Sequence, residues 1–198
     1  METLMGLCMG LALAAACGFR VFLPLLVMSI GARAGLISLG DNFQWLASWP
    51  AIVGFGTAAV LEVGAYFWPW LDHALDTVAT PAAIVAGTLA TASQIEGMNP
   101  ALTWLTGLIA GGGLAGGTQA ATVSTRGVST VTTGGLLNPI INAIQAAVAA
   151  VLSVLAVVVP IAAGLLVLSV ALLVVALVIR RARKRREARE DAVLRLAA

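Results

Sequence analysis

Apolar and polar positions along this chain form long blocks. Six blocks are apolar enough for helices that cross a bilayer, which need about 20 residues each. They cover residues 4–30, 50–68, 77–93, 101–121, 137–159 and 160–179. Short segments rich in Gly, Asp, Asn and Pro separate most of these blocks. The pattern therefore predicts an all-α integral membrane protein with about six transmembrane segments.

The fifth and sixth blocks have no polar loop between them, and only Pro160 interrupts the apolar sequence. As one helix, this stretch would be about 64 Å long, about twice the thickness of a bilayer core. We therefore expect the chain to turn at Pro160. A long kinked helix that protrudes from the membrane is the alternative.

The composition supports a membrane location and gives an orientation. Hydrophobic residues make up 60% of the chain, charged residues only 10%, and the mean hydropathy is +1.01. Eight of the eleven Lys and Arg residues lie between Arg180 and Arg195. We therefore expect a membrane domain over residues 1–180 and a basic cytoplasmic tail over 181–198. The tail can also bind anionic lipid headgroups. Six spans would place the N-terminus in the cytoplasm, and five would place it outside.

An internal repeat relates the two halves of the membrane domain. The segment "LMGLCMGLALA" from Leu4 aligns without gaps on "LTGLIAGGGLA" from Leu105. Two copies of a three-helix unit, about 1–98 and 99–180, must lie in opposite orientations. Inverted repeats of this kind are common in secondary transporters, whose sites lie near the midplane where helices are interrupted.

Two arginines interrupt the apolar pattern. Arg20 lies in the first block between Gly18 and Pro24, and Arg126 lies in a stretch rich in Gly, Ser and Thr. Irregular backbone at membrane depth must be buried in protein or line a wet cavity. We therefore expect broken helices that bring both arginines to one interior site for an anionic group. Two alternatives are an ion pair of Arg20 with Glu62 and a contact of Arg126 with lipid phosphates.

The acidic candidates are Glu62, Asp72 and Asp76, with His73 beside them. Carboxylates near a histidine suit proton or cation exchange. The alternative for residues 72–76 is a solvated loop with a helix cap. The chain carries no zinc spacing, nucleophile motif, P-loop or dinucleotide fingerprint. We therefore expect neither an enzyme nor a metal or cofactor, and nothing in the sequence predicts nucleic-acid binding.

Four segments together carry a resemblance: "GFRVFLP", "EVGAYFWPWLDHALDTV", "GGGLAGGTQAATVSTRG" and "STVTTGGLLNP". Over residues 4–180 the chain is similar to a bacterial family of multi-pass membrane proteins known as a domain of unknown function (DUF4126). The resemblance implies that Glu62, Pro69, Asp72 and Asp76 recur, with Arg20 and Arg126 as recurring basic positions. It implies no established activity. The resemblance also implies two departures. Relatives often carry an Asp-Lys pair at residues 66–67, where this chain has Tyr and Phe, and often carry acids after the Asn-Pro, where it has "INAIQ".

These observations predict a small transporter or channel-like permease of the bacterial inner membrane. In this hypothesis the arginines bind an anionic solute or lipid headgroup, and the carboxylates exchange protons or cations. The second hypothesis is a scaffold whose glycine-rich helices form a homo-oligomer and whose charges are structural. A membrane enzyme that acts on a lipid is the third and has the least support.

Overall fold

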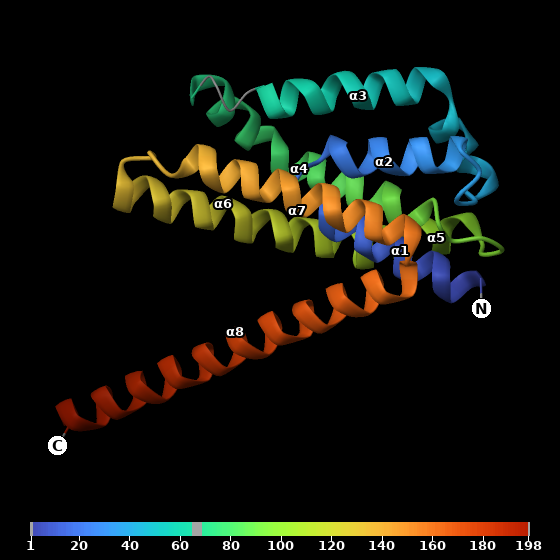
Figure 1. Cartoon of the computed structure of the whole chain (residues 1–198). Helices are drawn as coiled ribbons and strands as arrows, with labels where there is room; N and C mark the ends of the chain where they lie inside the picture. Colours follow the sequence, from blue (N-terminus) through green and yellow to red (C-terminus); the bar gives the residue numbers. More distant parts are fainter. Residues whose placement is uncertain (1, 65–68, 198) are drawn as a thin grey trace. The chain divides into compact units, whose positions relative to one another are not determined.

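The structure is a computed structural model that describes residues 2–64 and 69–197, with the side chains of residues 3–64 and 78–184. All regular secondary structure in these ranges is helical, as the sequence predicts. The chain divides into two compact units, Met1–Gly164 and Leu165–Ala198. The first unit holds helices α1 to α7 and the start of α8 (Figure 1).

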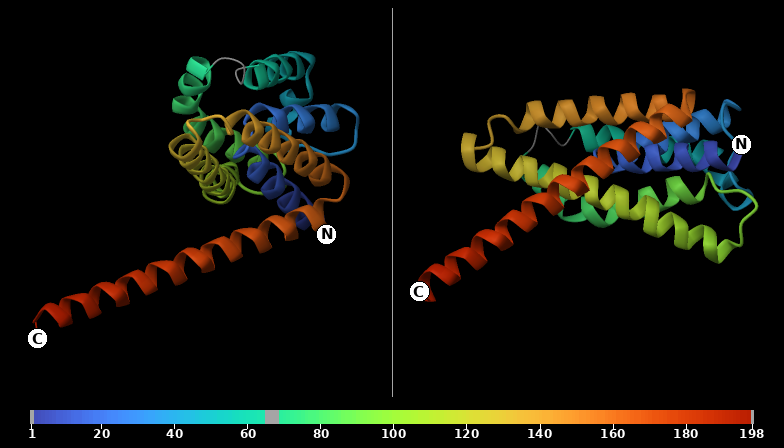
Figure 2. Two further views of the ribbon diagram at one scale, coloured as in Figure 1. Left: turned by 60° about the vertical axis from the view of Figure 1, so that its left-hand side comes forward. Right: turned by 90° about the horizontal axis from the view of Figure 1, so that it is seen from below.

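The first apolar block is two helices and not one span. Helix α1 (Glu2–Cys17) ends at a break over residues 18–21, and α2 (Phe22–Arg33) follows. The start of α1 and the end of α2 lie at the same end of the unit (Figures 1 and 2). Helix α1 is the central helix, because it contacts α2, α4, α6 and α7. The expected interruption around Arg20 is therefore confirmed. The block forms a hairpin whose tip lies inside the helical bundle, and the expectation of a single span over 4–30 is wrong.

The next segment begins with the 3-10 helix η1 (Asp41–Ala47), which meets α3 (Trp49–Gly64) at an angle of 61°. Helix α3 packs against α2 and η1 and buries only Ala51 and Ala59 fully. Helix α4 (Pro69–Ala92) includes residues 69–76, which the sequence analysis assigned to a connection. Proline at the first helical position is favourable, because its missing N–H has no intrahelical partner there.

Helix α5 (Pro100–Thr106), the π-helical segment η3 (Gly107–Gly112) and α6 (Gly113–Thr133) form one continuous helical run. The expected irregular backbone around Arg126 is therefore wrong. The hydroxyl groups of Ser and Thr explain the regular helix, because they donate back to carbonyls one turn earlier. Ser124 donates to the carbonyl of Ala120 at 2.7 Å, and Thr125 donates to that of Ala121 at 2.9 Å.

Small residues let α4 approach this helical run closely. A Cβ atom added at Gly87 would lie 2.5 Å from the Cβ of Ala115 and 2.7 Å from the carbonyl oxygen of Gly111. Any larger residue at Gly87 would push the two backbones apart. Small residues at helix interfaces have this role in membrane proteins, where lipid removes the hydrophobic driving force between helices.

Helix α7 (Asn138–Val158) follows α6 after a tight turn at Gly134 and Gly135, whose φ angles are +63° and +85°. Helix α8 (Pro160–Ala197) begins directly after Val159, whose φ and ψ are −136° and 68°. The break at Pro160 is therefore confirmed. The fifth and sixth blocks are separate helices.

Two helices, Asn138–Val158 and Pro160–Lys184, are long and apolar enough to cross a membrane. The bent pair of η1 and α3 would make a third span if it crosses as one unit. Three further apolar helices, Thr3–Cys17, Phe22–Arg33 and Val78–Ala92, are shorter. Large aliphatic side chains are exposed on many helices, including Val60 at 72% and Leu172 at 70%. The chain is therefore a helical membrane protein with two to three candidate spans among the residues that the structure describes.

Candidate functional site: a buried polar cluster at the α1–α2 break

The tip of the hairpin packs against α6. The carbonyl oxygen of Gly18 lies 3.5 Å from the hydroxyl of Thr122, which is buried. A side chain at Gly18 would overlap Thr118 and the carbonyl oxygen of Ala115. The sequence therefore needs glycine here because the backbone of the break touches the neighbouring helix.

Glu62 reaches from α3 to this break. Its carboxylate accepts hydrogen bonds from the backbone N–H groups of Val21 at 2.8 Å and Phe22 at 3.2 Å. The first N–H groups of a helix have no intrahelical acceptor and carry the positive end of the helix dipole. Glu62 therefore satisfies the start of α2 and places a negative charge where the backbone favours one.

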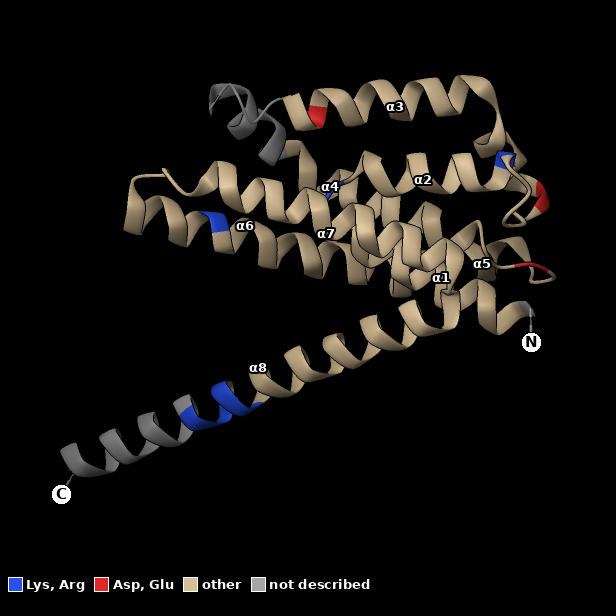
Figure 3. Cartoon of the chain, viewed as in Figure 1, with Lys and Arg blue, Asp and Glu red and all other residues tan. Residues whose placement is uncertain are grey.

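Both sequence-predicted arginines come close to this carboxylate. Arg20 is 6% exposed and Arg126 is 8% exposed, and the charges of both act on Glu62. Arg20 also donates from Nη2 to the backbone carbonyl of Asn142 on α7 at 3.2 Å. The structure therefore brings together three charged residues from three elements: the hairpin tip, α3 and α6. Figure 3 shows how few other charged residues lie in the described parts of helices α1 to α7.

Uncharged polar residues extend the cluster, and the sequence analysis did not single them out. Helix α6 buries a polar face whose members are three to four residues apart, and α7 adds two buried amides. These residues are Gln119, Thr122, Arg126 and Ser129 on α6, with Asn142 and Gln145 on α7. The spacing on α6 is the signal that could have found them, because residues i, i+3, i+7 and i+10 share one helix face.

The side-chain oxygen of Asn142 is buried without a partner among the residues that the structure describes. Asn142 is 2% exposed, and its Oδ1 accepts no hydrogen bond from any residue that the structure describes. A buried acceptor without a donor costs about 1–3 kcal/mol. Such a group favours a bound water or solute that can donate to it.

The remaining sequence candidates, Asp72, His73 and Asp76, lie in α4 outside the described side chains. Their part in the cluster stays a prediction. Among the described residues, no group of three or more His, Cys, Asp or Glu side chains could hold a metal ion. Cys8 and Cys17 are buried free thiols.

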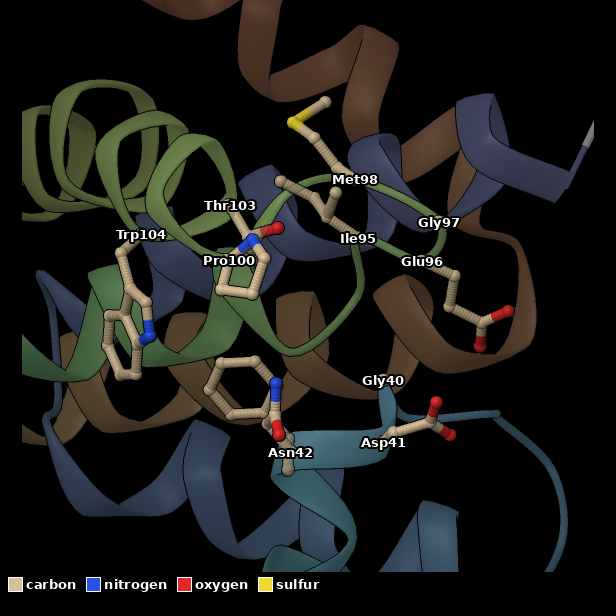
Figure 4. A pocket seen from close by; sticks show the side chains of 11 residues that line it. Gly40, Asp41, Asn42, Ile95, Glu96, Gly97, Met98, Pro100, Thr103 and Trp104 are labelled. Carbon is tan, nitrogen blue, oxygen red and sulfur yellow. The ribbon is translucent and has the colours of Figure 1, made fainter.

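A hollow of about 270 Å³ lies elsewhere, between η1 and the chain that joins α4 to α5 (Figure 4). None of its lining residues belongs to the polar cluster. The described side chains of the cluster are mostly buried, so a solute would reach it only after a movement of the helices.

The fold and cluster define a helical membrane protein with charged residues inside its bundle. The chain belongs to the family described as "Domain of unknown function (DUF4126)", whose model matches residues 7–181. No curated protein and no solved structure matches the chain.

Proposed function

We propose that this protein is a small membrane transporter that moves an anionic solute or an anionic lipid headgroup through the polar cluster. The observation that carries the proposal is the position of Glu62. Its carboxylate accepts hydrogen bonds from two backbone N–H groups that have no acceptor within their helix, and the charges of Arg20 and Arg126 act on it. An arrangement that holds a side-chain carboxylate in this way can hold the carboxylate or phosphate of a solute by the same chemistry.

Glu62 acts in this proposal as a built-in competitor of the solute. Within the described residues, the main contacts of helix α3, which carries Glu62, are with α2 and η1, so its movement disturbs little of the bundle core. When Glu62 leaves, the N–H groups of Val21 and Phe22 become available to an anion. Protonation of the carboxylate would weaken its hold and so couple the movement to a proton, with Asp72 and Asp76 as further exchanging groups.

The architecture adds support from general principles. Charged residues inside membrane helices are costly and mark solute or ion pathways. Interrupted helices that meet at such residues occur in transporters built from inverted repeats. We propose the same plan here, with two inverted units over about residues 1–98 and 99–180 in a bacterial inner membrane and a cytoplasmic C-terminus.

Electrical recording on proteoliposomes tests the proposal. The purified protein is reconstituted, adsorbed on a solid-supported membrane and exposed to concentration jumps of acetate, inorganic phosphate and chloride. A dithionite assay with labelled phosphatidylglycerol tests the lipid headgroup in parallel. We expect a signal from at least one probe with the wild type. Arg126→Gln should abolish it, and Arg33→Gln, which changes an exposed arginine outside the cluster, should retain it.

The scaffold hypothesis makes the opposite prediction. A scaffold would give no signal above empty liposomes with any probe, and Arg126→Gln would alter only stability or oligomeric state. The glycine faces that pack α4 against α6 already have a partner inside one chain, which favours the transporter over oligomerisation through these glycines.

A further inference from the structure

The hollow between η1 and the α4–α5 connection is a second site with its own chemistry. Its walls come from residues 40–43 and 95–104, all within the first compact unit. The backbone N–H of Gly40 donates to the carbonyl of Ser93 at 2.9 Å and ties the two walls together. The volume of about 270 Å³ is close to the lower limit of small-molecule sites, which are about 300–1,000 Å³.

The charge of this hollow is negative. Asp41 and Glu96 line it, and no Lys or Arg does. Neither carboxylate makes a hydrogen bond or ion pair with any residue in the described ranges. In Figure 4 the two acidic side chains lie on the same side of the view, and Trp104 lies on the opposite side. A ligand with a positive group at one end and an apolar body would match this division.

A buried threonine and an aromatic pair complete the lining. Thr103 is only 6% exposed, yet its hydroxyl makes no hydrogen bond within the described part of the chain, and its side chain lines the hollow (Figure 4). Phe43 and Trp104 lie with ring centroids 5.3 Å apart, and 48% of Trp104 is exposed. A hydroxyl that faces the hollow without a partner in the described part of the chain can bond to a ligand or water there. The aromatic faces suit a cation or an apolar group.

We propose that this hollow binds a small organic cation through its ammonium group, which the carboxylates of Asp41 and Glu96 hold. A bare metal ion fits poorly, because the hollow has room for several waters and its lining includes the aromatic rings of Phe43 and Trp104. An anion would meet two uncompensated carboxylates. The site is separate from the polar cluster and does not depend on its role in transport.

The ammonium group can come from a free amine or from the headgroup of a membrane lipid. Trp45 and Trp49, which follow the wall of residues 40–43 in the chain, are exposed. Exposed tryptophans are typical of the membrane–water interface. The two sources share one recognition chemistry, so one experiment with two arms separates them.

The first arm measures calorimetric binding of choline and ethanolamine to the purified full chain, with dimethylbutanol as the uncharged carbon isostere of choline. The second arm uses native mass spectrometry to compare retention of phosphatidylethanolamine with that of phosphatidylglycerol. Both arms compare the wild type with Asp41→Asn/Glu96→Gln, Thr103→Val and Trp104→Leu. Trp45→Leu is the matched control, because Trp45 is exposed and does not line the hollow.

We expect an ammonium ligand to bind in at least one arm. Binding in the first arm identifies a free amine, and binding in the second identifies a lipid headgroup. The double carboxamide variant should weaken binding about tenfold or more, because each exposed carboxylate contributes up to about fivefold. Trp104→Leu should weaken it about threefold to fivefold, and Trp45→Leu should bind as the wild type does. Asp41 begins η1, Glu96 lies in the α4–α5 connection and both are exposed, so their variants should keep the wild-type circular dichroism spectrum.

Three results would overturn the proposal. The first is that no ammonium compound binds in either arm. The second is that dimethylbutanol binds as tightly as choline. The third is that Asp41→Asn/Glu96→Gln, with an unchanged spectrum, binds as the wild type does.

Discussion

Replacing Glu62 by Gln changes one atom and tests how the hairpin tip is held. The carboxylate accepts two backbone hydrogen bonds, from Val21 and Phe22. Hydrogen bonds to a charged group contribute about 1.5–3 kcal/mol each. The amide of Gln keeps one accepting oxygen and turns an N–H₂ group toward a backbone donor. It also removes the negative charge beside Arg20 and Arg126.

We therefore expect Glu62→Gln to lower the free energy of unfolding by about 3 kcal/mol. We expect Glu62→Ala to lower it by about 3–5 kcal/mol, the usual cost of breaking a buried charge arrangement. The measurement is equilibrium unfolding in mixed detergent micelles, followed by circular dichroism. Glu96→Gln is the matched control, because Glu96 is exposed and makes no hydrogen bond with the described residues. It should change stability by less than about 0.5 kcal/mol.

The reasoning fails if Glu62→Gln is as stable as Glu96→Gln within about 0.5 kcal/mol. That result would mean that the N–H groups at the start of α2 find water or another acceptor at no cost. Glu62 would then have no structural role at the break, and its proposed competition with a solute would lose its basis.

Three further predictions concern packing and orientation. Gly87→Ala should destabilise the protein by about 1–3 kcal/mol, because its Cβ would lie 2.5 Å from a side chain on α6. Gly113→Ala, whose Cβ would have nothing within 4 Å, should be neutral or stabilising in the same unfolding assay. Equal effects of the two substitutions would contradict the packing. Thr91→Val should lower the free energy of unfolding by about 1 kcal/mol, because Thr91 is fully buried and its hydroxyl donates to the carbonyl of Gly10 at 3.1 Å. Thr125 is exposed and bonds within its own helix, so Thr125→Val should cost less than about 0.5 kcal/mol, the limit for surface changes. A larger loss with Thr125→Val than with Thr91→Val would contradict this reasoning. An Ala198→Cys variant that lacks the two native cysteines should resist an impermeant thiol reagent in intact cells, because the basic run before it predicts a cytoplasmic C-terminus, and labelling from outside would refute that orientation.

The sequence predicts the helical class, the break at Pro160 and the three charged residues of the cluster, for physical reasons. Pro160 has no N–H to donate to the helix before it, and the apolar stretch has no polar loop, so Pro160 is the expected position of the break. Arg20, Arg126 and Glu62 are conspicuous because charges inside apolar blocks need partners or solvent.

The hairpin and the regular α6 could not be predicted in the same way. Whether the first block is one span or two helices depends on the contact of Gly18 with α6, which lies a hundred residues later in the chain. The abundance of Gly, Ser and Thr around Arg126 predicts irregular backbone there. The Ser and Thr hydroxyls bond to their own helix instead, and only the backbone conformation decides between these two uses.

Solvent access to the polar cluster tests the central claim most directly, because it requires no knowledge of the solute. In a Cys8→Ala/Cys17→Ala background, Thr122→Cys places a thiol on α6 beside the hairpin tip, and Ser153→Cys places one on α7. Both positions are buried, at 4% and 0% exposure, and Ser153 is outside the cluster. A transporter that opens to its site predicts that an impermeant methanethiosulfonate labels Thr122→Cys in proteoliposomes and leaves Ser153→Cys unlabelled. Labelling of Thr122→Cys no faster than that of Ser153→Cys would contradict the account.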